Sequence, residues 1–217
     1  LLNKISNSFQ NVKTIYPGIN IKKNYIEENI SLNQGSPILL TLARLEKRKG
    51  ILPVLRCLSN LNKNKLLKPF QWNICGEGLQ FEEIRENIKK LNLTDQVFLI
   101  GKINNNLKQK FLESCDVFVM PSYKVNGSIE GFGISYIEAA AFRMPSIAGL
   151  DGGVTDAVID SKTGWCVDPL NQDQLANVLK DAINKKDLRQ KYGLHAEKQF
   201  LQRFLGCLLY TSDAADD

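Results

Sequence analysis

Residues 38–61 read ILLTLARLEKRKGILPVLRCLSNL, and this stretch decides the fold class. Its first five residues, Ile38–Leu42, are apolar apart from one threonine, which predicts a strand buried on both faces. Apolar residues then recur at Ile51, Val54, Leu55 and Leu58, the spacing of one face of a helix. A buried strand followed by an amphipathic helix is the unit from which parallel sheets are built.

The same alternation continues along the chain. Further strands are predicted at residues 70–75, 96–100, 116–120, 145–148 and 164–167. Helices are predicted at residues 81–91, 107–114, 133–142, 175–183 and 187–204. Roughly six βα units predict one α/β domain, a Rossmann-like doubly wound parallel sheet. Because ligands bind such sheets beyond the carboxyl ends of the strands, we expect the chemistry in the segments that follow them.

Composition excludes several other classes of protein. The 217 residues are 43% hydrophobic and 24% charged, which is ordinary for a globular domain. The net charge of +5 is too mild and scattered to indicate nucleic-acid binding and favours a solvated surface. No apolar run approaches the ~20 residues of a membrane span.

The cysteines and the histidine argue against a metal centre. Five cysteines, one of them Cys207, form no C-x-x-C pair, so we expect free thiols in a reducing compartment. His195 is the single histidine and follows a Lys- and Gln-rich stretch, which predicts a surface residue. A metalloenzyme or a histidine-based catalytic triad is therefore not expected.

The two ends of the chain differ from its middle. Residues 1–36 are polar, rich in Asn and Lys and broken by Pro17-Gly18, so we expect an entering segment and a linker. Residues 207–217 read CLLYTSDAADD, which resembles the in-frame translation of a transposon-type sequencing adapter. We therefore expect the native domain to occupy residues 37–206 and the tail to pack on nothing.

Two basic residues after the first strand can bind an anion. Arg44 and Lys49 bracket the segment that opens the first helix, where free N–H groups already favour negative charge. Arginine offers a fork for two phosphate oxygens and lysine a point charge. The segment lacks the glycines of a Walker loop, and the alternative reading is a solvated basic face.

A glycine-rich segment with two glutamates gives the stronger signal. Glu130-Gly131-Phe132-Gly133 precedes a predicted helix, so the backbone can approach a ligand and the first N–H groups can hold a phosphate. Glu138 would lie about one turn into that helix, where its carboxylate could accept from two vicinal hydroxyls. Its apolar neighbours make an unpartnered carboxylate costly. Glu130 could serve a second polyol, although both glutamates can also be plain surface charges.

These features together resemble the C-terminal half of a family-4 retaining glycosyltransferase with the GT-B fold, closest in look to phosphatidylinositol mannosyltransferases. The resemblance covers residues 15–204. The motifs that carry it are Tyr16-Pro17-Gly18-Ile19, Arg44, Lys49-Gly50, Gly76-Glu77-Gly78, Val97–Gly101, Pro121-Ser122, the Glu130/Glu138 pair, Gly152-Gly153 and Thr163-Gly164. It implies that residues 1–36 end a missing N-terminal domain.

The resemblance also implies roles for individual residues. Arg44 and Lys49 would bind the donor diphosphate and stabilise it as the leaving group, and Glu138 would hold the ribose. Glu130 would contact the transferred sugar, and the loop near Ile103 would meet the base. Backbone groups of the glycine loop would bind sugar and phosphate, and that loop comprises Gly131, Phe132, Gly133, Ile134 and Ser135.

The wider implications concern the reaction and its partners. The resemblance implies a hexosyltransferase that needs no metal or other cofactor, with GDP-mannose or another GDP- or UDP-sugar as donor. The acceptor, a glycan, lipid or polyol, would bind the missing domain, so this chain alone would be inactive. We expect a cytoplasmic enzyme of cell envelope polysaccharide synthesis without nucleic-acid partners. Any peripheral contact with the inner face of the membrane would be made through the missing domain.

The sequence departs from the family pattern at three positions, and it leaves other functions open. Ala43 and Arg143 stand where glycine is usual, and Asp156 stands where glutamate is common. An arginine at position 143 must adopt a left-handed conformation or end its helix differently. The alternatives are a GT-B epimerase or phosphorylase, or a non-catalytic Rossmann module, although no G-x-G-x-x-G follows the first strand.

Overall fold

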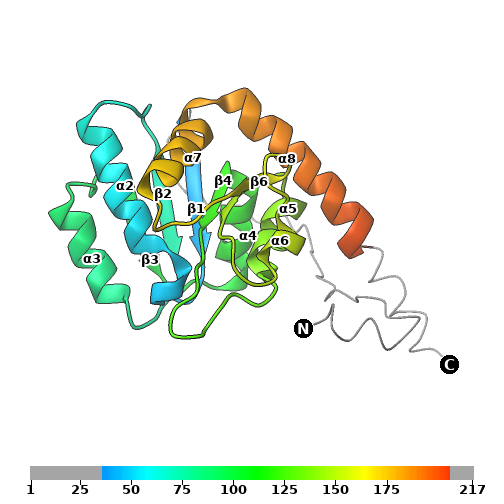
Figure 1. The fold of residues 1–217 in the computed structure, drawn as a ribbon, viewed down its shortest axis with the longest axis horizontal. Helices are drawn as coiled ribbons and strands as arrows, with labels where there is room; N and C mark the ends of the chain where they lie inside the picture. Colours follow the sequence, from blue (N-terminus) through cyan, green and yellow to red (C-terminus); the bar gives the residue numbers. More distant parts are fainter. Residues whose placement is uncertain (1–35, 206–217) are drawn as a thin grey trace.

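The computed structural model describes residues 36–205, which form a parallel sheet with helices on both faces (Figure 1). The six strands lie in the order β3-β2-β1-β4-β5-β6, and each pairs in parallel with its neighbour. Their bounds are β1 Ile38–Leu42, β2 Gln71–Cys75, β3 Val97–Gly101, β4 Val117–Met120, β5 Ser146–Ala148 and β6 Gly164–Cys166. The sequence therefore predicted the fold class correctly. The predictions for residues 1–35 and 207–217 lie outside the described residues.

Successive strand residues face opposite sides of the sheet and feed two separate cores. In β4, Val117 and Val119 belong to one hydrophobic cluster, whereas Phe118 and Met120 belong to the other. All four side chains are buried. This is why the strand has no polar alternation in its sequence.

The helices divide between the two faces. Helices α2 (Ile51–Lys63), α3 (Phe81–Lys90) and α7 (Gln172–Asn184) supply the first cluster, and Figure 1 shows α2 and α7 lying together in front of the sheet. Helices α4 (Asn105–Ser114), α5 (Ile134–Ala141) and α6 (Val154–Ala157) supply the second. Helix α8 (Lys186–Phe200) packs along α5 and continues into the short π-helix η3 (Leu201–Leu205).

Three local features differ from the sequence-based expectations. Strand β3 is not buried on both faces: Phe98 is 38% exposed and Ile100 40%, because β3 is an edge strand. The last helix changes to π geometry at Leu201. The short helices α6 and η2 (Lys47–Lys49) were not predicted, since three or four residues cannot show a helical period.

Helix α5 ends at the position where the sequence raised a question. Arg143 adopts φ 57° and is therefore left-handed. The Arg143 N–H donates to the Ala140 carbonyl at 3.1 Å, and the Met144 N–H donates to the Ala139 carbonyl at 3.0 Å. This pair of bonds is a Schellman motif, which glycine usually closes. The guanidinium instead pairs with Glu197 of α8 at 2.6 Å, joining the two helices.

The strand order places a switch point between β1 and β4. The sheet grows outward from β1 toward β3 and from β4 toward β6, so the connections leave these two central strands in opposite directions. A crevice at the carboxyl ends of such strands is where doubly wound sheets bind ligands. The segments that follow β1 and β4 contain Arg44–Gly50 and Pro121–Gly133.

Candidate functional site

The segments after β1, β4 and β5 are fastened to one another at the carboxyl edge of the sheet. The Tyr123 N–H donates to the Arg48 carbonyl at 2.9 Å, joining the first two segments. The Gly153 N–H donates to the Gly131 carbonyl at 2.8 Å, joining the second and third. A Cβ on Gly152 would lie 2.0 Å from the Glu130 carbonyl oxygen, so only glycine permits this approach. The backbone around Glu130 is therefore held from two sides.

Glu130 is the centre of a cluster of charged side chains. Its carboxylate accepts from Arg48 Nη1 at 2.6 Å and from Lys49 Nζ at 2.5 Å. Arg48 also donates from Nε to Glu46 at 3.0 Å. The structure thus brings together two residues predicted from the sequence, Lys49 and Glu130, and adds Arg48 on the same carboxylate oxygen.

Burial makes this cluster tighter than a surface ion pair. The side chains of Arg48, Lys49 and Glu130 are 12%, 8% and 12% exposed. Burial lowers the pKa of Lys49, and the hydrogen bond and charge of Glu130 oppose that shift. Burial alone would raise the pKa of Glu130, but the hydrogen bonds and charges of Lys49 and Arg48 lower it below its ordinary value. Glu130 is therefore a fixed anion at neutral pH.

Arg44 does not reach this cluster directly. Its side chain is 75% exposed and pairs with Glu46 at 3.1 Å. Glu46 in turn pairs with Arg48, so Arg44 is at the outer end of a chain of alternating charges. Arg44 and Lys49 thus pair with different carboxylates, and their predicted convergence on one anion stays a prediction.

The start of α5 lies beside the charged cluster. Gly133 precedes the helix with φ 73°, and a Cβ there would lie 2.4 Å from the Tyr136 ring. The Tyr136 hydroxyl donates to the carbonyl of Met120, which fixes α5 to the end of β4. Ser135 donates from Oγ to the Leu42 carbonyl at 3.2 Å, which fixes it to the end of β1. These contacts hold the N-terminus of α5 at the ends of β1 and β4, where a helix N-terminus favours an anion.

Glu138 has a cationic partner from another helix. Its carboxylate accepts from Lys108 Nζ of α4 at 2.5 Å, and the Glu138 side chain is 16% exposed. This pairing explains how a carboxylate is tolerated between Ile137 and Ala139, which are both buried. Glu130 and Glu138 therefore lie in separate charge pairs, one on each side of the start of α5.

The remaining predicted residues lie around this edge. Ile103 follows β3 and packs, half-buried, against the second hydrophobic cluster. Phe132 packs edge-on against Phe204 of η3, with ring centroids 5.8 Å apart. Gly131 is exposed, and the Ile134 side chain is 49% exposed. The roles given to all of these residues stay predictions.

The sequence did not indicate three of the charged residues at this edge: Glu46, Arg48 and Lys108. Arg48 and Glu46 were part of the quoted basic segment, but nothing in their spacing distinguished them from solvated charges. Lys108 comes from a helix 30 residues before its partner, so only the packing of α4 beside α5 could reveal it.

The described residues contain neither a cluster of metal-binding side chains nor a thiol with a lowered pKa. Within residues 36–205, no group of three or more His, Cys, Asp or Glu side chains could hold a metal ion. Cys57, Cys75, Cys115 and Cys166 are free thiols. Burial raises the pKa of Cys57 to about 11 and that of Cys75 to about 12, so both stay protonated at neutral pH.

The fold and the site together define a Rossmann-like domain with cations and a helix N-terminus at its ligand-binding edge. The chain belongs to the family described as glycosyl transferases group 1, whose model matches residues 22–199. Its structural neighbours are GT-B glycosyltransferases.

Curated relatives agree on the family and differ in what they transfer. The 2-deoxystreptamine N-acetyl-D-glucosaminyltransferase of Niallia circulans is 27% identical over 81% of this chain and 43% of its own length. The GDP-mannose-dependent alpha-(1-6)-phosphatidylinositol monomannoside mannosyltransferase of Mycolicibacterium smegmatis is 30% identical over 68% of this chain and 38% of its own. The chain thus spans about two fifths of these relatives.

Solved structures agree on the fold. A mutant of TarM from S. aureus, solved with fondaparinux, alpha-GlcNAc-glycerol and UDP, gives a TM-score of 0.73 at 24% identity. That match covers 96% of this chain and 41% of TarM. The C-terminal domain of a glycosyl transferase group 1 protein from Francisella tularensis gives 0.66 at 24% identity, covering 77% of this chain and 86% of that domain.

Proposed function

We propose that this chain is the donor-binding, C-terminal half of a retaining glycosyltransferase, and that its carboxyl edge binds the diphosphate and sugar of a nucleotide-sugar. The observation that carries the proposal is the buried contact of Lys49 and Arg48 with Glu130, beside the N-terminus of α5. These three groups suit a sugar diphosphate. The cations and the helix N-terminus can bind its phosphates, and the carboxylate can accept hydrogen bonds from its sugar hydroxyls.

The chemistry follows from the charge that develops during transfer. Departure of the nucleoside diphosphate leaves negative charge on its terminal phosphate, and a fixed cation there stabilises the transition state more than the ground state. In this structure Lys49 donates to Glu130. Donor binding would turn Lys49 toward the phosphate, while Arg48 keeps Glu130 in place and ionised. Arg44, which is largely exposed, would swing in from the rim.

The identity of the donor, meaning its nucleotide base and its sugar, is a separate part of the proposal. The Mycolicibacterium relative is named as GDP-mannose-dependent, whereas the TarM structure was solved with UDP. We favour GDP-mannose because Glu130-Gly131-Phe132-Gly133 and the segment after it resemble the phosphatidylinositol mannosyltransferases. The acceptor would bind residues outside this chain, and the reaction would need no metal.

Calorimetry with the 217-residue chain tests the proposal. We expect GDP or UDP to bind, and the intact nucleotide-sugar to bind more tightly. Lys49→Gln should lower the affinity by about 10- to 150-fold, the equivalent of one lost charged hydrogen bond of about 1.5–3 kcal/mol. Lys198→Gln, an exposed lysine on α8, is the matched control and should bind as the parent does. Equal affinities for parent and Lys49→Gln would overturn the proposed site.

A further inference from the structure

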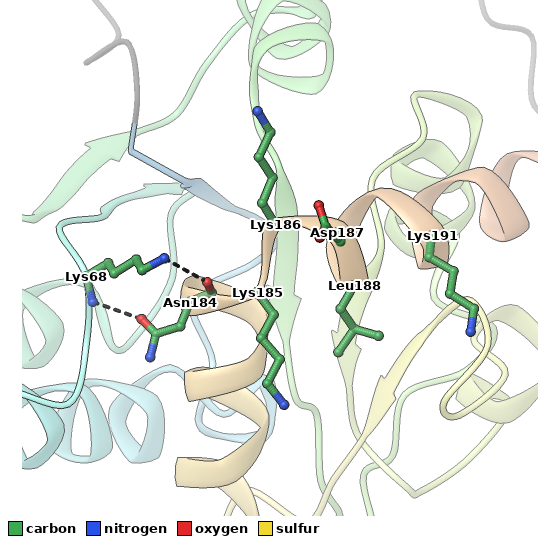
Figure 2. Close-up of a pocket in the computed structure, with 7 residues that line it drawn as sticks. All are labelled: Lys68, Asn184, Lys185, Lys186, Asp187, Leu188 and Lys191. Carbon is green, nitrogen blue, oxygen red and sulfur yellow. Dashed lines mark hydrogen bonds between the residues drawn. The ribbon is translucent and has the colours of Figure 1, made fainter.

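Two lysine-rich segments that are far apart in the sequence lie side by side at the amino-terminal edge of the sheet. One is the connection from α2 to β2, residues 63–68, and the other is the junction of α7 and α8, residues 184–191. Asn184 joins them: its side chain accepts from the Lys68 backbone N–H at 2.9 Å, and its backbone carbonyl accepts from Lys68 Nζ at 3.3 Å (Figure 2). The Asn184 side chain also donates to the Leu66 carbonyl at 2.8 Å. This edge is opposite the candidate site. The connection from α2 leads to the start of β2, and the junction of α7 and α8 is hydrogen-bonded to that connection.

The two segments concentrate positive charge, and we call them the basic edge. Their exposed cations are Lys63, Lys65, Lys68, Lys185, Lys186 and Lys191. Asp187 is the single acidic residue within the two ranges. Lys185 pairs with Asp181 at 2.7 Å, but an exposed pair of this kind contributes little and is readily exchanged for another partner. Cations that are far apart in the sequence are therefore brought to one edge of the described domain.

The lysines are spread over a face rather than directed at one point. Four of them, Lys68, Lys185, Lys186 and Lys191, line an open hollow of about 630 Å³ together with Asn184. Figure 2 shows the side chains of Lys185 and Lys186 leaving the helix junction in opposite directions. Converging donors would suit a single phosphate, whereas spread point charges suit an extended anionic surface.

An apolar side chain lies within this charged face. Leu66 is 48% exposed between Lys65 and Lys68. The turn that presents it is left-handed at Lys65, with φ 55°, and is closed by the Leu66 N–H donating to the Leu61 carbonyl at 3.0 Å. Binding at the lipid–water boundary combines burial of apolar side chains with attraction of cations to anionic lipids, and Leu66 with its neighbouring lysines offers both.

We propose that the basic edge docks this domain on an anionic lipid bilayer, with the lysines on the lipid phosphates and Leu66 among the headgroups. A nucleic-acid partner is disfavoured, since neither segment contains an aromatic residue to stack on a base. Docking in this way would hold the candidate site about 20 Å above the surface, the length of a 13-residue helix such as α2. The inference does not rest on the proposed function.

Vesicle co-sedimentation of the 217-residue chain tests the inference. We expect binding to vesicles of equal parts phosphatidylglycerol and phosphatidylcholine. Binding should be absent with phosphatidylcholine alone and should weaken steeply as salt is raised. Equal binding to both kinds of vesicle, or to neither, would overturn the inference.

Matched variants separate the basic edge from net charge. Replacing three of its lysines (Lys65→Gly, Lys68→Gln, Lys186→Gln) should weaken binding on the order of 100-fold, at about 1 kcal/mol for each lysine near the surface. The control replaces three exposed lysines elsewhere with glutamine, Lys102, Lys124 and Lys198, and should change binding little. Glycine relieves the left-handed position of Lys65, so that change should not destabilise the fold. Equal losses in both triple variants would contradict a defined docking face.

Leu66→Asn distinguishes a membrane from other polyanions. It leaves the charge unchanged, and it should weaken vesicle binding about 10-fold through lost apolar burial. Binding of a labelled DNA duplex should be unaffected by it. If the triple lysine variant loses duplex binding while vesicle binding persists, the basic edge serves a nucleic acid and the membrane inference is wrong. A free phosphate, tested as glycerol phosphate at matched ionic strength, should not compete; competition would indicate a discrete anion site instead.

Discussion

At the scale of single residues, the candidate site consists of two glutamates that each have their own cationic partners. Glu130 is held by Arg48 and Lys49, and Glu138 is held by Lys108. The two carboxylates therefore cannot substitute for one another, since different cations and different elements fix them. A difference between their roles should be measurable in binding.

Glu138→Gln should weaken binding of a bare nucleoside diphosphate, because we place this carboxylate on the ribose. Glu130→Gln should leave that affinity unchanged or raise it, since Lys49 is then released from its carboxylate partner. Each lost charged hydrogen bond should cost about 1.5–3 kcal/mol. Titration of both variants with nucleoside diphosphate and with the intact nucleotide-sugar makes the comparison. A greater loss of bare nucleotide binding in Glu130→Gln would reverse the assignment.

The Glu130 pair should also make stability depend on pH. The carboxyl has its pKa lowered in the folded protein, from an ordinary value of 4.5. A group with a depressed folded pKa stabilises the fold above its unfolded pKa, and that stability is lost as the pH falls toward the folded value. We therefore expect the Tm difference between the parent and Glu130→Gln to be constant near neutrality and to shrink below about pH 4.5. A difference that grows on acidification would show that Glu130 is not stabilised as an anion.

At the scale of elements, helix α5 is the part that organises the site. Its first residue follows the left-handed Gly133, its Tyr136 anchors to β4 and its Ser135 anchors to β1. Its far end is closed by a left-handed Arg143 bound to α8. The helix is short, so its position depends on these tertiary contacts more than on its own hydrogen bonds.

Gly133→Ala should destabilise the protein by about 1–3 kcal/mol and lower donor affinity. The added Cβ would meet the Tyr136 ring at 2.4 Å and would sit at a positive φ. Gly131→Ala, two residues earlier, is the matched control for stability, because a Cβ there meets nothing within 4 Å. Urea unfolding measures the stabilities, and calorimetry the affinities. Two equally stable variants would show that α5 can shift without cost.

At the scale of the whole molecule, the chain spans about two fifths of the length of the relatives it matches. The chain covers 43% of the Niallia relative and 41% of TarM, but 86% of the isolated Francisella domain. Within the described residues, no helix is long and apolar enough to cross a membrane. The two functional edges that we infer lie at opposite ends of the strands.

The 217-residue chain should bind nucleotide and yet transfer no sugar. It holds the proposed donor residues, whereas proximity between donor and acceptor, which supplies much of the rate of a two-substrate reaction, needs an acceptor site. Incubation with labelled GDP-mannose or UDP-glucose and candidate lipid or glycan acceptors should give no product above background. If the parent chain does form product and Lys49→Gln abolishes it, this chain contains a complete active site and the prediction is wrong.

The sequence by itself determined the layers of the fold and the segments in which to look for a site. Apolar runs such as Ile38–Leu42 can be satisfied only between two covered faces, and helical spacing such as that of Ile51, Val54 and Leu55 places the covering helix. The resemblance then singled out Lys49 and Glu130, which the structure brings into contact. The local sequence is enough to predict these features, because the alternation of side chains along a strand or helix is fixed by backbone geometry within a few residues.

Only the tertiary structure decided which charges meet. Glu130 and Arg48 are 82 residues apart, Glu138 and Lys108 are 30 apart, and the two segments of the basic edge are joined by Asn184 and Lys68 across 116 residues. A charged side chain looks alike in the sequence whether it is solvated or paired. The difference arises when strand order and helix packing bring a partner within 3 Å, and that depends on the whole chain.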